Sequence, residues 1–123
     1  MSLIIDTSQT GIKKTLKEHE EMALRFIWSI GEEGANSRRT WEAVNEQLEG
    51  KTISRASIIN FLNKMVDQNV LNFRDVTGKG GHQRVYYPRL DVKGYRIYII
   101  KTVLDSLMKD FPEETRKVIT QYI

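Results

Sequence analysis

The most constraining feature of the sequence is a helical pattern followed at once by a strand–turn–strand pattern, within residues 54–88. Apolar residues recur at helical spacing in the first part: Ile58, Ile59, Leu62, Met65 and Val66. This spacing predicts an amphipathic helix over residues 54–68, with the Ser54 hydroxyl as its N-cap. Alternating apolar and polar residues then predict two strands, 71–76 and 83–87, joined by a loose glycine-rich tip at 77–82.

A second amphipathic segment precedes this helix. Trp41, Val44 and Leu48 lie at helical spacing within residues 38–48, Asn36 or Ser37 is available as a cap, and Gly50 ends the segment. Two helices joined by a short turn and followed by a hairpin form a winged helix-turn-helix. We therefore expect a mainly α fold with a small β-hairpin.

Residues 15–30 are expected to form the first helix, with Thr15 and Glu18 as a capping box. Its predicted buried side consists of Leu16, Met22 or Ala23, Phe26, Ile27 and Ile30. Residues 1–14 show no helical period and are expected to form an N-terminal arm. The expected organisation is this arm, a winged-helix domain over residues 15–89, and a helical region over residues 90–123.

The C-terminal region has its own apolar pattern. The predicted seam contains residues at alternating spacings of three and four, with flanking apolar residues: Ile97, Ile100, Val103, Leu104, Leu107, Met108 and Phe111. Pro112 then starts a last short helix. Since the winged domain is already complete at Pro88, we expect the seam to form the interface of a homodimer. The alternative is that it folds back onto the first helix.

Charge is distributed unevenly along the chain, although the net charge is only +3. Residues 17–50 carry four Lys or Arg against eight Glu, a net charge of −4. Residues 51–89 carry seven Lys or Arg against two Asp, a net charge of +5. Such asymmetry is typical of a domain with a face for a polyanion, and also occurs on ordinary solvated surfaces.

Double-stranded DNA is the polyanion that a winged helix-turn-helix most often binds. The outward polar residues of the second predicted helix of the motif are the candidate base contacts: Arg55, Ser57, Asn60 and Lys64. Basic residues at the start of residues 38–48, in the turn and on the hairpin are the candidate backbone contacts: Arg38, Arg39, Lys51, Lys79, His82 and Arg84. The two arginines at 38 and 39 have the alternative of being ordinary surface residues.

The assembled residues resemble the penicillinase-repressor (BlaI/MecI-like) family of winged-helix regulators over residues 16–111. The run LKEHE at 16–20, with Ile27-Trp28, is similar to the family's L-x-E-x-E…L-W opening. The run SRASI at 54–58 resembles the start of its S-x-x-T-[IV] recognition helix, and VYYP at 85–88 resembles the Y-x-Y-x-P close of its wing. The resemblance implies a dimeric repressor on a palindromic operator. The tip of the wing is longer than the family's, and no protease-cleavage site or copper-binding cysteine matches.

Other classes of function are disfavoured. The chain contains no cysteine, which removes thiol catalysis and cysteine metal ligands. Glu18, Glu20 and Glu21 are better explained as a solvated face than as a metal site, and no nucleophile–base pair is signalled, so we expect no enzyme, metal or cofactor. No apolar run spans a membrane and no secretory leader is evident, which predicts a cytoplasmic protein. A winged-helix module for protein–protein interaction is the alternative, and it would require an apolar outer face on the helix at 54–68.

Overall fold

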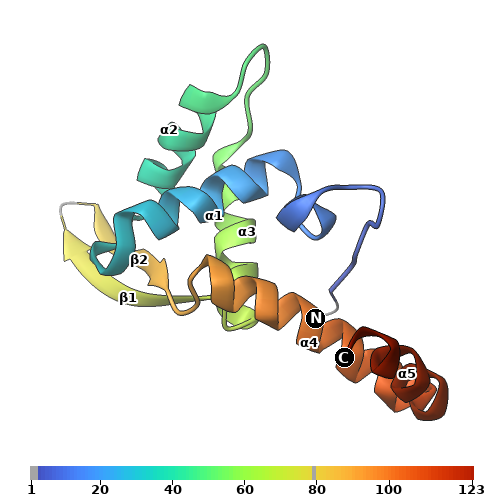
Figure 1. Cartoon of the computed structure of the whole chain (residues 1–123). Coiled ribbons are helices and arrows are strands. Elements are labelled where there is room, and N and C mark those ends of the chain that lie inside the picture. Colours follow the sequence, from blue (N-terminus) through green and yellow to red (C-terminus); the bar gives the residue numbers. More distant parts are fainter. Residues whose placement is uncertain (1–2, 79) are drawn as a thin grey trace.

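The computed structural model describes residues 3–78 and 80–123, and its element order confirms the expected fold (Figure 1). The elements are η1 (Gly11–Lys14), α1 (Glu18–Ile30), η2 (Gly31–Glu33), α2 (Ser37–Gln47), α3 (Arg55–Asp67), β1 (Leu71–Gly78), β2 (Gly81–Pro88), α4 (Val92–Asp110), α5 (Pro112–Ile119) and η3 (Thr120–Tyr122). Helices α1 to α3 and the β1–β2 hairpin form a winged helix-turn-helix.

The first helix begins later than predicted. The N-cap of α1 is Lys17, whose backbone N–H donates to the Glu20 carboxylate over 2.8 Å. The predicted capping box of Thr15 and Glu18 is therefore wrong. The Thr15 hydroxyl bonds instead to the Ile12 carbonyl and, over 2.8 Å, to the Tyr95 hydroxyl.

The turn between α2 and α3 is fixed by side chains of α2. Asn36 caps α2 by accepting from the Arg39 N–H over 2.8 Å. At the other end, the indole N–H of Trp41 donates to the Ile53 carbonyl, and Asn45 Oδ1 accepts from the Ile53 N–H, each over 2.8 Å. Because the N–H and the carbonyl of Ile53 are both held, the direction in which α3 leaves the turn is set.

The hairpin is longer and more regular than predicted. Its antiparallel register runs from Leu71 opposite Pro88 to Gly78 opposite Gly81. The loose tip predicted at 77–82 is therefore wrong at four positions, which belong to the strands: Thr77, Gly78, Gly81 and His82. A third segment joins the sheet through Ala35, whose N–H and carbonyl each bond to Tyr86 over 2.9 Å. This bridge attaches the hairpin to the start of α2.

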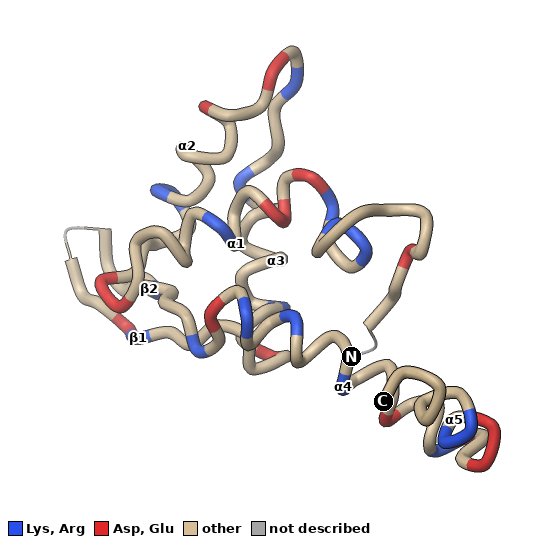
Figure 2. The backbone as a smooth tube through the Cα atoms, viewed as in Figure 1, with Lys and Arg blue, Asp and Glu red and all other residues tan. Residues whose placement is uncertain are grey.

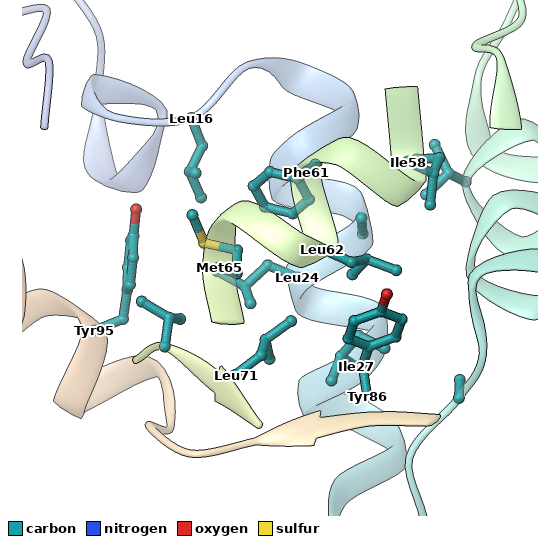
Figure 3. Close-up of a cluster of buried hydrophobic side chains, with 14 of the residues drawn as sticks. Leu16, Leu24, Ile27, Ile58, Phe61, Leu62, Met65, Leu71, Tyr86 and Tyr95 are labelled. Carbon is teal, nitrogen blue, oxygen red and sulfur yellow. The ribbon is translucent and has the colours of Figure 1, made fainter. Parts of the chain in front are cut away.

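The core lies where α1, α3 and the hairpin meet, and side chains from all three converge there (Figure 3). The fully buried large side chains include Leu24 and Ile27 of α1, Ile58 and Leu62 of α3, and Leu71 of β1. The segment expected to be an arm also contributes, since Ile12 of η1 is buried in the same cluster beside Leu16 of the predicted first helix. The end of that segment therefore packs on the winged domain.

Helix α4 packs on the winged domain with one side near its start and then extends beyond it, and α5 folds back along its far end (Figure 1). Tyr95 is 1% exposed and its ring centroid lies 6.0 Å from that of Trp28 in α1. The predicted seam lies on the opposite side of α4, where Ile97 and Ile100 are 57% and 59% exposed. The alternative in which the seam folds back onto α1 is therefore wrong.

We predict that Gly34→Ala destabilises the domain far more than Gly31→Ala. Both glycines have positive φ, +72° and +73°, with ψ of 176° and −146°. Alanine should cost each about 1–3 kcal/mol of backbone strain. A Cβ on Gly34 would also lie 2.5 Å from the Tyr86 carbonyl oxygen, whereas a Cβ on Gly31 meets nothing within 4 Å. Urea unfolding should show a further loss of about 1–3 kcal/mol for Gly34→Ala; equal losses would contradict the close approach.

Candidate nucleic-acid interface

The buried residues of α3 lie on one side of the helix, and the opposite side is available for a ligand. Ile58, Phe61, Leu62 and Met65 are at most 3% exposed, so Phe61 belongs to the core of the domain. Successive residues of an α-helix are rotated by about 100°. The side opposite the buried one therefore presents Ala56, Asn60, Asn63 and Asp67, which we call the outer face.

The predicted base contacts occupy different positions relative to the outer face. Asn60 is an exposed residue of this face, and Arg55 is exposed at the first turn of α3. Ser57 is half-buried, and its hydroxyl lies 2.9 Å from that of Ser54, the N-cap. Lys64 is half-buried and lines a hollow beside Ile4 in the N-terminal segment. Asn60 and Arg55 are thus the better placed for contact with a large ligand.

Asn63 was not among the predicted contacts, although it lies on the outer face. Its Oδ1 accepts a hydrogen bond from the Tyr86 hydroxyl over 2.6 Å and another from Arg84 Nη1 over 3.1 Å. The sequence did hold a signal for its position, because residues 56, 60, 63 and 67 have helical spacing opposite the buried set. Its partners in β2 had no such signal, since they lie more than twenty residues away.

The hairpin beside α3 carries the other predicted contacts. The guanidinium carbon of Arg84 lies 3.9 Å from the centroid of the Phe73 ring in β1. The same guanidinium donates to Asn63 of α3, so it is held between the hairpin and that helix. His82 is exposed near the tip, with Nδ1 3.3 Å from the Thr77 hydroxyl. Lys79 lies outside the described residues. Arg84 is therefore presented in an ordered position.

Three predicted backbone contacts lie in exposed ion pairs. Arg38 pairs with Glu42 over 3.0 Å, Lys51 pairs with Glu18 over 2.8 Å, and Arg39 lies 3.9 Å from a carboxylate oxygen of Glu33. The hydrogen bond from Lys51 is the main cause that lowers the pKa of Glu18. Exposed pairs of this kind contribute little to stability, because solvent screens them. These cations can consequently exchange a carboxylate for a phosphate at little cost.

Basic residues lie at the start of α2, at the start of α3 and on the hairpin, with acidic residues between them (Figure 2). Arg74 of β1 is engaged elsewhere, because its guanidinium donates to the backbone carbonyls of Glu32 and Glu33. Within residues 3–78 and 80–123, no group of three or more His, Asp or Glu side chains is arranged to hold a metal ion. No helix in the same part of the chain combines the length and apolarity needed to cross a membrane.

Comparisons with known proteins give fold likenesses only. No protein-family model matches the chain, and neither does any curated protein, so the similarity to the penicillinase-repressor family rests on the residues quoted above. Among solved structures, a proposed transcriptional regulator from Thermoplasma acidophilum is 15% identical, with a TM-score of 0.48 over 74% of this chain and 93% of that one. The zinc-responsive MarR family member ZitR from Lactococcus lactis is 19% identical, with a TM-score of 0.47 over 99% of this chain and 79% of that one. Neither likeness identifies the family of this chain.

Proposed function

We propose that this chain is a sequence-specific DNA-binding transcriptional regulator that uses α3 as its recognition helix. The observation that carries the proposal is the chemistry of the outer face. Asn60 and Asn63 lie there beside Ala56, with Arg55 at the first turn and Arg84 held alongside. Small and amide side chains of this kind fit against base edges in the major groove, and arginine reads guanine or contacts phosphate.

The charge along α3 favours entry of its N-terminal half into the groove. Arg55 lies at the first turn, whereas Asp67 ends the helix. The N-terminal residues of a recognition helix contact base edges in related motifs. In this arrangement Arg55 and Asn60 read bases, with Ser57 and Lys64 at the edge of the contact. The DNA phosphates replace the carboxylate partners of three cations: Arg38, Arg39 and Lys51. On the wing, further phosphate contacts come from Lys79, His82 and Arg84.

A protein-interaction module would require an apolar outer face on α3. The half-buried Ile59 is the large apolar residue nearest to that face, and Ala56, Asn60 and Asn63 offer little area for hydrophobic burial. The outer face therefore supports DNA over a protein surface as its ligand.

The second part of the proposal is a homodimer formed through α4. The predicted interface residues lie on the side of α4 opposite Tyr95, and three of them are between 48% and 59% exposed: Ile97, Ile100 and Phe111. Val103, Leu104, Leu107 and Met108 are half-buried along the part of α4 that α5 covers. Two-fold pairing of this side would present two copies of α3 to a palindromic operator, as expected for a repressor.

We predict that DNA binding weakens steeply with salt. With roughly 6 to 10 phosphate contacts per dimer, affinity should fall by about 10³- to 10⁵-fold between 50 and 200 mM salt, because binding releases condensed counterions. Anisotropy titrations with a duplex of random sequence measure this directly. Lys51→Ala should reduce the salt slope, whereas Lys117→Ala on α5 should leave it unchanged. Absence of binding at low salt would overturn the DNA-binding proposal.

We predict that Ile100→Asp separates the dimer without unfolding the chain. A carboxylate in an apolar interface is costly, while Ile100 is 59% exposed in the single chain and contributes little to its core. The matched control is Ser106→Asp, an exposed position of α4 on the side opposite the seam. Sedimentation should show monomer for Ile100→Asp and dimer for the control, with operator affinity lost only in the monomer. A wild type that is already monomeric at micromolar concentration would contradict the proposed interface.

A further inference from the structure

The side-chain amide of Asn63 has an orientation that chemistry fixes. Its Oδ1 accepts from two donors at once, the Tyr86 hydroxyl at 2.6 Å and Arg84 Nη1 at 3.1 Å. A guanidinium carries only donors, so the amide atom that faces Arg84 has to be the oxygen rather than the nitrogen. The alternative orientation would place N–H groups of both residues against each other.

Both donors are themselves held in place. Tyr86 is 3% exposed, and its backbone N–H and carbonyl both bond to Ala35. Burial is the main cause that raises the pKa of Tyr86 above its usual value. A tyrosine hydroxyl is protonated at neutral pH even without this shift, so it is able to donate. Arg84 lies over the Phe73 ring at 3.9 Å. The amide of Asn63 is therefore held by groups that cannot easily turn away.

The nitrogen of the Asn63 amide, Nδ2, is available to donate to a ligand. Among the described residues, no hydrogen bond involves Asn63 Nδ2, which carries two hydrogens. An unrestrained asparagine pairs with adenine by accepting from N6 and donating to N7. Asn63 cannot make that pair, because its acceptor is already engaged by Tyr86 and Arg84.

We propose that Asn63 is a specificity-determining residue that acts only as a donor and prefers an edge that presents acceptors alone, guanine O6 and N7 or thymine O4, over adenine, whose N7 acceptor lies beside the N6 donor. The proposal rests on the DNA-binding function proposed above and assigns this residue a base preference. It also predicts the effect of exchanging the amide for a carboxylate. In the Asn63→Asp variant the carboxylate would still accept from Tyr86 and Arg84, but it would present an oxygen to the base and so favour the N4 donor of cytosine.

The test is selection of binding sites from a pool of random-sequence duplexes, carried out with the wild type, Asn63→Ala, Asn63→Asp and Asn60→Ala. At one position of the site, the wild type should prefer guanine or thymine. The discrimination against other bases at that position should fall by roughly 5- to 150-fold in Asn63→Ala. In Asn63→Asp the preferred base there should change to cytosine. Asn60→Ala should leave that position unchanged and affect another. Thermal unfolding of each variant checks that the fold persists.

A second measurement needs no variant. If the selected base is guanine, its replacement by 7-deazaguanine in the wild-type site removes one acceptor and should weaken binding; if it is thymine, replacement by 4-thiothymine, a weaker acceptor, should do so. The inference would be overturned if the wild type prefers adenine at the position whose base preference is lost in Asn63→Ala. It would also be overturned if Asn63→Ala loses no base preference at any position. Either result would leave the DNA-binding proposal intact. A wild type that enriches no site would overturn the proposed sequence-specific function itself.

Discussion

Tyr86 is the residue on which the geometry of the proposed DNA-binding surface depends. Its backbone pairs with Ala35 at the start of α2, its ring is buried in the core, and its hydroxyl donates to Asn63 on the proposed recognition helix. One residue of β2 thus connects the wing, α2 and α3. Gly34 allows this connection, because any side chain there would occupy the space of the Tyr86 carbonyl. The wing and α3 consequently form one rigid surface.

The two sides of α4 have separate roles. Tyr95, Tyr98 and Ile99 pack against the winged domain, and Thr15 in the N-terminal segment bonds to the Tyr95 hydroxyl. These contacts fix the direction in which α4 leaves the domain. The apolar seam on the opposite side is consequently displayed at a defined angle, which is the property that a two-fold dimer with a fixed spacing of recognition helices requires.

Local signals in the sequence predicted most of the fold. The sequence predicts α3 almost at its observed bounds, because Ser54 is a cap whose hydroxyl accepts from the Ser57 N–H. The predicted first helix begins too early, because a second carboxylate, Glu20, accepts from the backbone N–H of Lys17 and the helix starts there. The frequency of glycine in turns favours a loose tip over residues 77–82, whereas Gly78 and Gly81 pair within the sheet.

The candidate site was less predictable than the fold, since its decisive contacts join distant segments. The outer face of α3 depends on the burial of Phe61, which the predicted apolar stripe of that helix did not include. The orientation of Asn63 depends on its hydrogen bonds with Tyr86 and Arg84. The position of the Arg84 guanidinium depends in turn on its contact with the Phe73 ring. Each of these contacts follows from the register of the hairpin and its docking on α3, which no local pattern specifies.

The most direct test of the account is an NMR titration of the ¹⁵N-labelled chain with a duplex selected by the wild type. If α3 and the wing form the DNA-binding surface, the largest shift changes should occur in the amides of Arg55 and Ala56, in the side-chain amides of Asn60 and Asn63, and along β2 near Arg84. Changes centred on the start of α1 or on the exposed side of α4, with those groups of α3 unaffected, would contradict it.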